Sequence, residues 1–140
     1  MKLSALFAGS LLLLASACCA TGPCEGDTCD TAVDGDAWTS IWDGESDPLD
    51  AGWRMAGPGA FEVSDGAMTA TGGMGLLWYA DASYGDFSLS LEWMVEDETD
   101  NAGVFVRFPD PGEDPWVAVH QGYELQICDA AGEGHNTGSV

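Results

Sequence analysis

Glu124 and Gln126 are polar residues that could take part in chemistry, and they alternate with apolar residues between Gly122 and Asp129. Successive side chains of a β-strand point to opposite faces of a sheet, so these two share one face. A carboxylate and an amide on one surface could act as a base and as a hydrogen-bonding group. The alternative interpretation is an ordinary half-exposed strand with a polar outer face. The residues expected to pack toward the core are Tyr123, Leu125 and Ile127.

Two further segments alternate in the same way and must help to position these side chains. One face of residues 101–108 carries Asn101, Gly103, Phe105 and Arg107, and the other carries Val104, Val106 and Phe108. In residues 86–93 the outward side chains are Ser88, Ser90 and Glu92, and the inward ones are Phe87, Leu89, Leu91 and Trp93. If the three strands are neighbours in one sheet, a single polar surface presents Glu92, Arg107, Glu124 and Gln126.

The charge balance of the chain is strongly acidic, with 24 Asp and Glu residues against 3 Lys and Arg residues. One of the three bases, Lys2, lies in the N-terminal leader, which leaves Arg54 and Arg107. Such a field repels phosphate backbones and anionic lipid surfaces, so the charge argues against nucleic acid as a partner. So many carboxylates could bind cations or adapt the surface to high salt, but the acids are scattered, which favours ordinary solubility. Arg107 either binds an anion or a carbonyl group, or forms a structural salt bridge.

The N-terminus has the pattern of a secretory signal. Lys2 precedes a short apolar run over residues 6–14 and the small residues 15–17, so we expect residues 1–17 to be a signal peptide. Residues 14–18 resemble a bacterial lipoprotein box, which would place a lipid anchor on Cys18, and a freely secreted product is equally open. In either case we expect an exported protein of the periplasm, the outer membrane or the extracellular space.

The next segment, residues 18–36, contains almost no large apolar side chain and predicts a flexible, acidic linker. In an oxidising compartment Cys24 and Cys29 could form a small disulfide within it. Cys128 has no cysteine beside it in the sequence, and we expect it to be a packed thiol rather than a nucleophile.

From residue 37 onward, short apolar runs are separated by turn residues, with no sustained helical period, so helix should be nearly absent. Many short strands of this kind indicate an all-β sandwich, jelly roll or barrel. The chain ends without the strands that would close two sheets, so we expect the domain over residues 37–140 to be truncated at its C-terminus. The later predicted strands are Leu76–Tyr79, Phe87–Val95, Ala102–Phe108, Val117–His120 and Tyr123–Cys128.

Aromatic and histidine side chains divide into core and site candidates. Trp116 follows the Pro-rich, acidic loop over residues 109–115, and we expect it to be exposed for stacking on a sugar ring. His120 ends an apolar run and should lie at a strand edge, whereas His135 lies in a Gly-rich loop where a site residue is plausible. The tryptophans expected to fill the core are Trp42, Trp53, Trp78 and Trp93.

Several segments occur in the order of a known family. They are Trp38–Gly44, Gly52–Arg54, Phe61–Gly66, Tyr84–Leu89, Asn101–Arg107 and Gly122–Asp129. Together they resemble the 3-keto-disaccharide hydrolase domain, from about Trp38 to the end of the chain. Ala102 departs from the family, where Ser is common, and the family continues beyond the position of Val140. The resemblance implies a concanavalin-like jelly roll of two antiparallel sheets, similar to laminin-G domains.

The resemblance also implies a hydrolase that acts on the glycosidic bonds of 3-keto-glycosides. A ketone at C3 acidifies the C2 hydrogen, so the bond can break by proton abstraction and elimination, followed by water addition. This chemistry needs a base, a group that stabilises the enolate, and an acid for the leaving oxygen. We assign Glu124 as the base and Arg107, with Asn101 or a divalent metal ion, to the enolate oxygen. The candidates for acid or metal ligand are Glu92, Asp129 and His135, and Gln126 and Trp116 complete the expected carbohydrate site.

Two other functions remain open. Residues 124–129 resemble the catalytic strand of laminarinase-like retaining glycosidases, but Gln126 stands where a second carboxylate is needed on the same face. A non-catalytic, laminin-G-like carbohydrate-binding module would need only a polar concave face and Trp116, and fold alone does not separate it from an enzyme.

Overall fold

The fold is known from a computed structural model, which describes residues 2–8, 14–19, 39–97, 99–128 and 136–140. In this part of the chain the structure consists of strands, one short α-helix, α1 (Trp116–Gln121), and one turn of 3-10 helix, η1 (Pro48–Asp50). The strands are β1 (Lys2–Ala8), β2 (Leu14–Cys19), β3 (Thr39–Ser40), β4 (Trp53–Ala56), β5 (Ala60–Ser64), β6 (Ala67–Thr71), β7 (Gly75–Tyr79), β8 (Phe87–Glu92), β9 (Asn101–Phe108) and β10 (Tyr123–Ile127). The all-β prediction is confirmed.

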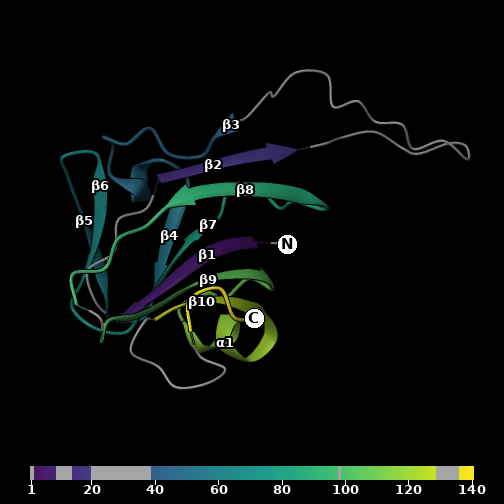
Figure 1. Ribbon diagram of the computed structural model, residues 1–140. Coiled ribbons are helices and arrows are strands. Elements are labelled where there is room, and N and C mark those ends of the chain that lie inside the picture. The colour runs from purple at the N-terminus through teal and green to yellow at the C-terminus, as the bar shows by residue number, and fades with distance from the viewer. Residues whose placement is uncertain (1, 9–13, 20–38, 98, 129–135) are drawn as a thin grey trace, which may run out of the picture.

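The strands form antiparallel sheets that are stacked as a sandwich (Figure 1). A five-stranded sheet has the order β10-β9-β1-β7-β4, a three-stranded sheet has the order β3-β2-β8, and β5 pairs with β6 as a hairpin. The strands β9 and β10 are neighbours, as predicted, but β8 belongs to the other layer. The three predicted site strands therefore do not form one surface.

The main core lies between the layers. Trp53 and Leu77 of the five-stranded sheet are at most 2 % exposed, and Met68 of the hairpin is completely buried. On β8 the side chains of Phe87, Leu89 and Leu91 are partly buried against this core, whereas the alternate residues are exposed, as predicted. Of the tryptophans expected in the core, Trp42, Trp53 and Trp78 are buried, but Trp93 is 36 % exposed.

A second core covers the outer face of the five-stranded sheet. Trp78 and Phe105 are buried there together with Ala118 of α1. The helix lies beside β9 and β10 (Figure 1). The segment predicted as the strand Val117–His120 is therefore helical. Asp114 favours the helix start, because its carboxylate accepts a hydrogen bond from the backbone N–H of Trp116 at 3.0 Å.

Fewer side chains of β10 are buried than the sequence alternation predicted. Ile127 is buried, but Tyr123 is 60 % and Leu125 is 42 % exposed. The reason is the position of β10 at the edge of the five-stranded sheet, where the smaller facing sheet does not cover it.

The segment predicted to be a signal peptide contributes a strand to each of the two larger sheets. The strand β1 lies between β7 and β9, and β2 pairs with β8 and β3. The strand β2 includes Cys18 and Cys19, the first two residues of the segment predicted as a linker. In the described part of the chain, no helix is both long and apolar enough to cross a membrane.

Candidate active site

Glu124 lies in β10 on the outer face of the five-stranded sheet. In the pairing of β10 with β9, Glu124 stands opposite Phe105 and Gln126 stands opposite Gly103. Residues that stand opposite each other in antiparallel strands have their side chains on the same face. Glu124 and Gln126 therefore share one face, as predicted, and it is the face on which Phe105 is buried.

The Glu124 carboxyl group lies directly over Gly103. A Cβ atom added at Gly103 would lie 2.7 Å from Cγ and 2.8 Å from Cδ of Glu124, far inside van der Waals contact. Only glycine leaves this space open. The strand β9 thus provides a recess for the carboxylate. The sequence alternation placed Gly103 on the same face as Glu124, but it did not reveal that Gly103 forms this recess.

The helix-to-strand connection fixes where β10 begins. The backbone N–H of Gly122 donates to the carbonyl oxygen of Ala118 at 2.9 Å, which ends α1. A Cβ atom at Gly122 would lie 2.8 Å from that oxygen and 3.0 Å from the carbonyl oxygen of Val106. Glycine at this joint lets α1 and β9 come together, two residues before Glu124.

Burial raises the pKa of the Glu124 carboxyl group above its ordinary value of 4.5. The physical cause is desolvation, because removal of water disfavours the charged form of an acid. A half-buried carboxylate with a raised pKa is a stronger base than one in water, as a proton-abstracting group requires.

Arg107 does not join Glu124 on this face. Its backbone has a φ of 62°, and the pairing of β9 with β1 shifts register between Val106 and Phe108. This is a β-bulge, which interrupts the alternation of side chains. Phe108 consequently packs with Phe105 in the outer core, and Arg107 borders a groove on the inner side together with Val104. The prediction that Arg107 shares a surface with Glu124 is wrong.

Glu92 is also separated from Glu124. It is an exposed residue at the end of β8, in the three-stranded sheet. Asn101 is exposed at the start of β9 and, two residues before Gly103, falls on the face of Glu124 by the strand alternation. By register and alternation, Glu124, Gln126 and Asn101 therefore share the outer face, and Glu92 lies in the other sheet.

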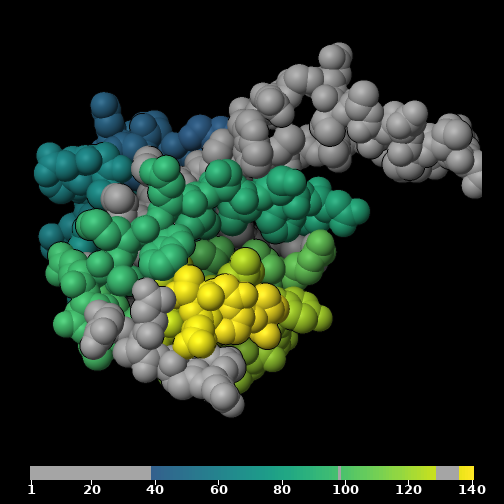
Figure 2. Space-filling view, viewed as in Figure 1, coloured from purple at the N-terminus to yellow at the C-terminus, as the bar shows by residue number. Residues whose placement is uncertain are grey.

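The inner groove is a feature that the sequence did not predict. It has a volume of about 620 Å³ and runs between β8 and the inner face of β9 and β10. In Figure 2 the C-terminal residues 136–140, in yellow, lie beside the green band of β8, and Thr137 and Gly138 border the groove. The sequence alternation predicted that every apolar side chain in the walls of the groove points toward the core. It therefore gave no sign that the groove is open.

Arg107 is the charged residue of the groove and Trp93 is its largest aromatic residue. The other polar and aromatic residues that line it are Phe87, Ser90, Gln126 and Thr137. The Nη2 atom of Arg107 lies 3.6 Å from the Oδ1 atom of Asp86, which precedes β8. Both side chains are exposed to water, so this salt bridge adds little to stability. It nevertheless connects the two layers across the groove.

Trp116 lies on the first turn of α1 rather than in a loop. It is 50 % exposed, as expected for a residue that stacks on sugars, and its ring stacks on His120 with centroids 6.1 Å apart. One turn of helix separates the two residues, so this is a neighbouring pair on the helix surface. His120 is therefore an exposed helical residue and not a strand-edge one.

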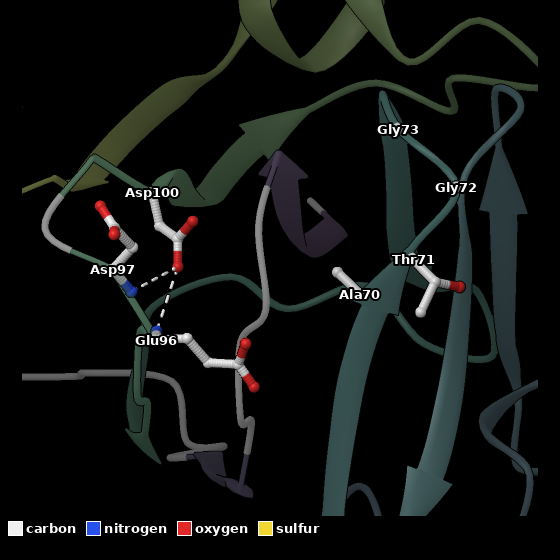
Figure 3. A pocket seen from close by; sticks show the side chains of 7 residues that line it. All are labelled: Ala70, Thr71, Gly72, Gly73, Glu96, Asp97 and Asp100. Carbon is white, nitrogen blue, oxygen red and sulfur yellow. Dashed lines mark hydrogen bonds between the residues drawn. The ribbon is translucent and has the colours of Figure 1, made fainter.

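A second cavity, of about 350 Å³, is acidic (Figure 3). Glu96, Asp97 and Asp100 line one side and the turn after β6 lines the other. The Asp100 carboxylate accepts hydrogen bonds from the backbone N–H groups of Glu96 and Asp97 at 3.0 and 3.1 Å. The Thr99 hydroxyl and backbone N–H lower the pKa of Asp97. The carboxylates of Asp97 and Asp100 therefore accept hydrogen bonds from within the loop that contains them.

The described residues contain no cluster of the side chains that commonly bind metals. No three His, Cys, Asp or Glu side chains among them are grouped so that they could hold an ion. Asp129 and His135, two of the expected acids or ligands, lie outside the described residues. Cys128 is buried, and its backbone N–H donates to the Thr137 hydroxyl at 3.1 Å.

Comparison with known proteins identifies the family. Residues 37–140 match the family described as the 3-keto-alpha-glucoside-1,2-lyase-like domain. The chain belongs to this family. No curated protein matches the chain, and no solved structure matches it. The family assignment of the lyase-like domain therefore rests on the sequence of about three quarters of the chain, the part that contains every strand from β3 to β10.

Proposed function

We propose that the lyase-like domain cleaves the glycosidic bond of 3-keto-glycosides by abstraction of the C2 proton, with Glu124 as the base. The observation that carries the proposal is the Glu124 carboxylate, half-buried over Gly103, with its pKa raised by desolvation. The family description, a 1,2-lyase-like domain, agrees with an elimination between C1 and C2 of the sugar.

The proposed reaction has two stages, an elimination and an addition of water. Glu124 takes the C2 proton, and the electron pair forms an enolate with the C3 carbonyl group. The enolate then expels the C1 oxygen with its aglycone, which takes up a proton, and a C1–C2 double bond remains. Water adds across that bond to give the free 3-keto sugar. The step that most needs help is the first, because an aliphatic C–H bond is a weak acid.

Amide groups on the outer face are the proposed partners of the enolate. Asn101 and Gln126 share the face of Glu124, and a side-chain amide N–H donates to an oxygen that gains negative charge. Trp116 lies on the helix that covers the same face and offers an exposed ring to the sugar. Asp129 and His135 remain candidates for the acid that protonates the leaving oxygen. No step is assigned to a metal ion.

The test is aglycone release from a 3-keto-glucoside by the intact chain and by Glu124→Gln. We expect the variant to lose at least about 100-fold in kcat, because the amide cannot accept the proton. The matched control is Glu62→Gln on the exposed face of β5, which should retain activity. Equal activity in Glu124→Gln and the control would remove Glu124 as the base. A parallel assay with a chelator asks whether a divalent metal ion contributes.

A second function, non-catalytic carbohydrate binding, is favoured by the inner groove. Its exposed Trp93 and its arginine are groups that contact sugars in binding proteins. This function predicts no turnover of a 3-keto-glucoside by the intact chain, together with binding of an unoxidised glycan that Trp93→Ala weakens. Turnover of a plain glucan would instead favour the retaining glycosidase.

A further inference from the structure

The inner groove is apolar along its walls and opens to water at its mouth. Three strands each contribute two aliphatic side chains to it: Leu89 and Leu91 of β8, Val104 and Val106 of β9, and Leu125 and Ile127 of β10. Val104 and Ile127 are at most 7 % exposed, which places them at the bottom. Trp93 and Leu125 are 36 % and 42 % exposed, which places them at the mouth. A ligand that enters between the layers therefore passes from water to hydrocarbon.

Arg107 is the only charged residue among the described residues that line this groove. Regular alternation would place it on the outer face with Phe105, and the β-bulge, where φ is 62°, turns it inward. Bulges often redirect a side chain beside a functional site, and a strained non-glycine backbone is a common feature of ligand-binding residues. The Arg107 side chain is 40 % exposed, so its positive charge lies at the mouth of the groove.

The interior of the groove suits a hydrocarbon chain better than a sugar ring. Sugar hydroxyl groups placed against the aliphatic walls would lose water without gaining hydrogen bonds, which costs free energy. An alkyl chain carries no such groups, and its burial is favoured by the hydrophobic effect. The volume of about 620 Å³ is within the usual range of small-molecule sites, which are mostly apolar with a few polar groups that fix orientation.

We propose that the inner groove binds a linear alkyl carboxylate, with the alkyl chain between the layers and the carboxylate on the Arg107 guanidinium. A guanidinium has five N–H donors in one plane, so it can hold a ligand carboxylate beside the carboxylate of Asp86, whose Oδ1 lies 3.6 Å from Nη2. The site goes beyond the proposed lyase function, because Glu124 lies on the outer face of the sheet.

The acidity of the chain opposes this ligand only at long range. The whole chain has a formal net charge of -21, which repels any anion. At physiological salt the Debye length is about 8 Å, so acids farther away than this are largely screened. The direct contact with Arg107 is screened much less, and burial of the alkyl chain does not depend on charge. The local contacts therefore decide binding at this salt concentration.

The test measures the Kd of decanoate for the intact chain by calorimetry, at pH 7 and about 150 mM salt, where long-range repulsion is screened. We expect saturable binding that Arg107→Gln weakens at least about tenfold, because a charge-assisted hydrogen bond is lost. Asp86→Asn is the matched control: it breaks the same ion pair but keeps the guanidinium, so it should not weaken decanoate. The neutral probe 1-decanol should bind Arg107→Gln and the intact chain equally.

A second pair of variants tests the groove itself. Leu125→Trp enlarges an exposed side chain at the mouth and should weaken decanoate and 1-decanol alike. Leu49→Trp, at an exposed position of η1 outside the groove, should weaken neither. Absence of saturable decanoate binding, equal loss in Arg107→Gln and Asp86→Asn, or unchanged binding in Leu125→Trp would each overturn the proposal. Binding of a glucan oligosaccharide that Trp93→Ala weakens, without binding of decanoate, would assign the groove to carbohydrate instead.

Discussion

Glu124 is positioned by the absence of a side chain at Gly103. The sequence alternation predicted correctly that Glu124 and Gln126 share a face of the sheet with Gly103. It could not predict that the carboxyl group bends over the glycine, because this depends on the distance between β9 and β10 and on the rotamer of one side chain.

The first prediction concerns this recess. In Gly103→Ala the new Cβ would meet Cγ of Glu124 at 2.7 Å, so the carboxyl group must move outward into water. We expect its pKa to fall toward the ordinary value, which NMR titration of the Glu124 side chain measures, and aglycone release to fall about tenfold or more. Gly85→Ala is the control, because nothing lies within 4 Å of a Cβ there. An unchanged pKa in Gly103→Ala would show that the recess does not set it.

The second prediction concerns pH. Since burial raises the pKa of Glu124 above 4.5, the folded state holds this proton more tightly than the unfolded state. Well below pH 4.5 the carboxyl group is protonated in both states, so its ionisation does not change stability there. As pH rises from there through the raised pKa, the free energy of unfolding should fall relative to that of Glu124→Gln. Urea unfolding of both proteins across this range measures the difference.

A pH-independent difference between the two proteins would contradict the raised pKa. Activity should change in the opposite direction from stability. The rate of aglycone release should rise as Glu124 ionises, because only the carboxylate accepts the C2 proton.

The bulge in β9 decides which face receives Arg107. Residues 101–106 follow the predicted alternation, and the order is lost only where φ becomes positive. Nothing in the sequence Val-Phe-Val-Arg-Phe indicates a bulge, since arginine rarely adopts this conformation. The helix α1 could not be predicted from the sequence either, because a short apolar run fits a strand as well as a helix.

The third prediction concerns the strain in this bulge. A non-glycine residue with a φ of 62° is held in a conformation that glycine adopts freely. Arg107→Gly should therefore be more stable than Arg107→Ala by about 1 kcal/mol in urea unfolding, although both lose the contact with Asp86. At Val106, where φ is negative, the same pair of substitutions should show the reverse order. If Arg107→Ala were instead more stable than Arg107→Gly, the bulge would carry no strain.

The layers of the molecule could be predicted from the sequence only in part. Alternation in β8, β9 and β10 identified the inward faces, and turn residues separated the strands. Which strands pair is not contained in alternation, because any two apolar faces can pack together. That is why β8 was expected beside β9 and lies in the other layer, and why the groove between them was not foreseen.

The fourth prediction concerns the charge of the whole molecule. The whole chain has a formal net charge of -21, so its surface charges repel one another, and added salt screens this repulsion. We expect the melting temperature to rise by several degrees between about 10 and 300 mM NaCl, where the Debye length falls below the spacing of most surface charges. Sucrose at the same osmolality is the control for effects of excluded solute. An unchanged melting temperature would indicate that the acids are paired or bind cations.

The place of β1 also fixes the order of events during synthesis. Lys2 pairs with Phe108 and Ser4 pairs with Trp78, so β1 waits for partners that are made much later in synthesis. Contacts between such distant parts of a chain form late in folding. The strand β1 consequently stays unpaired while most of the domain is being translated. Its place at the centre of the five-stranded sheet is filled only after β7 and β9 have both been made.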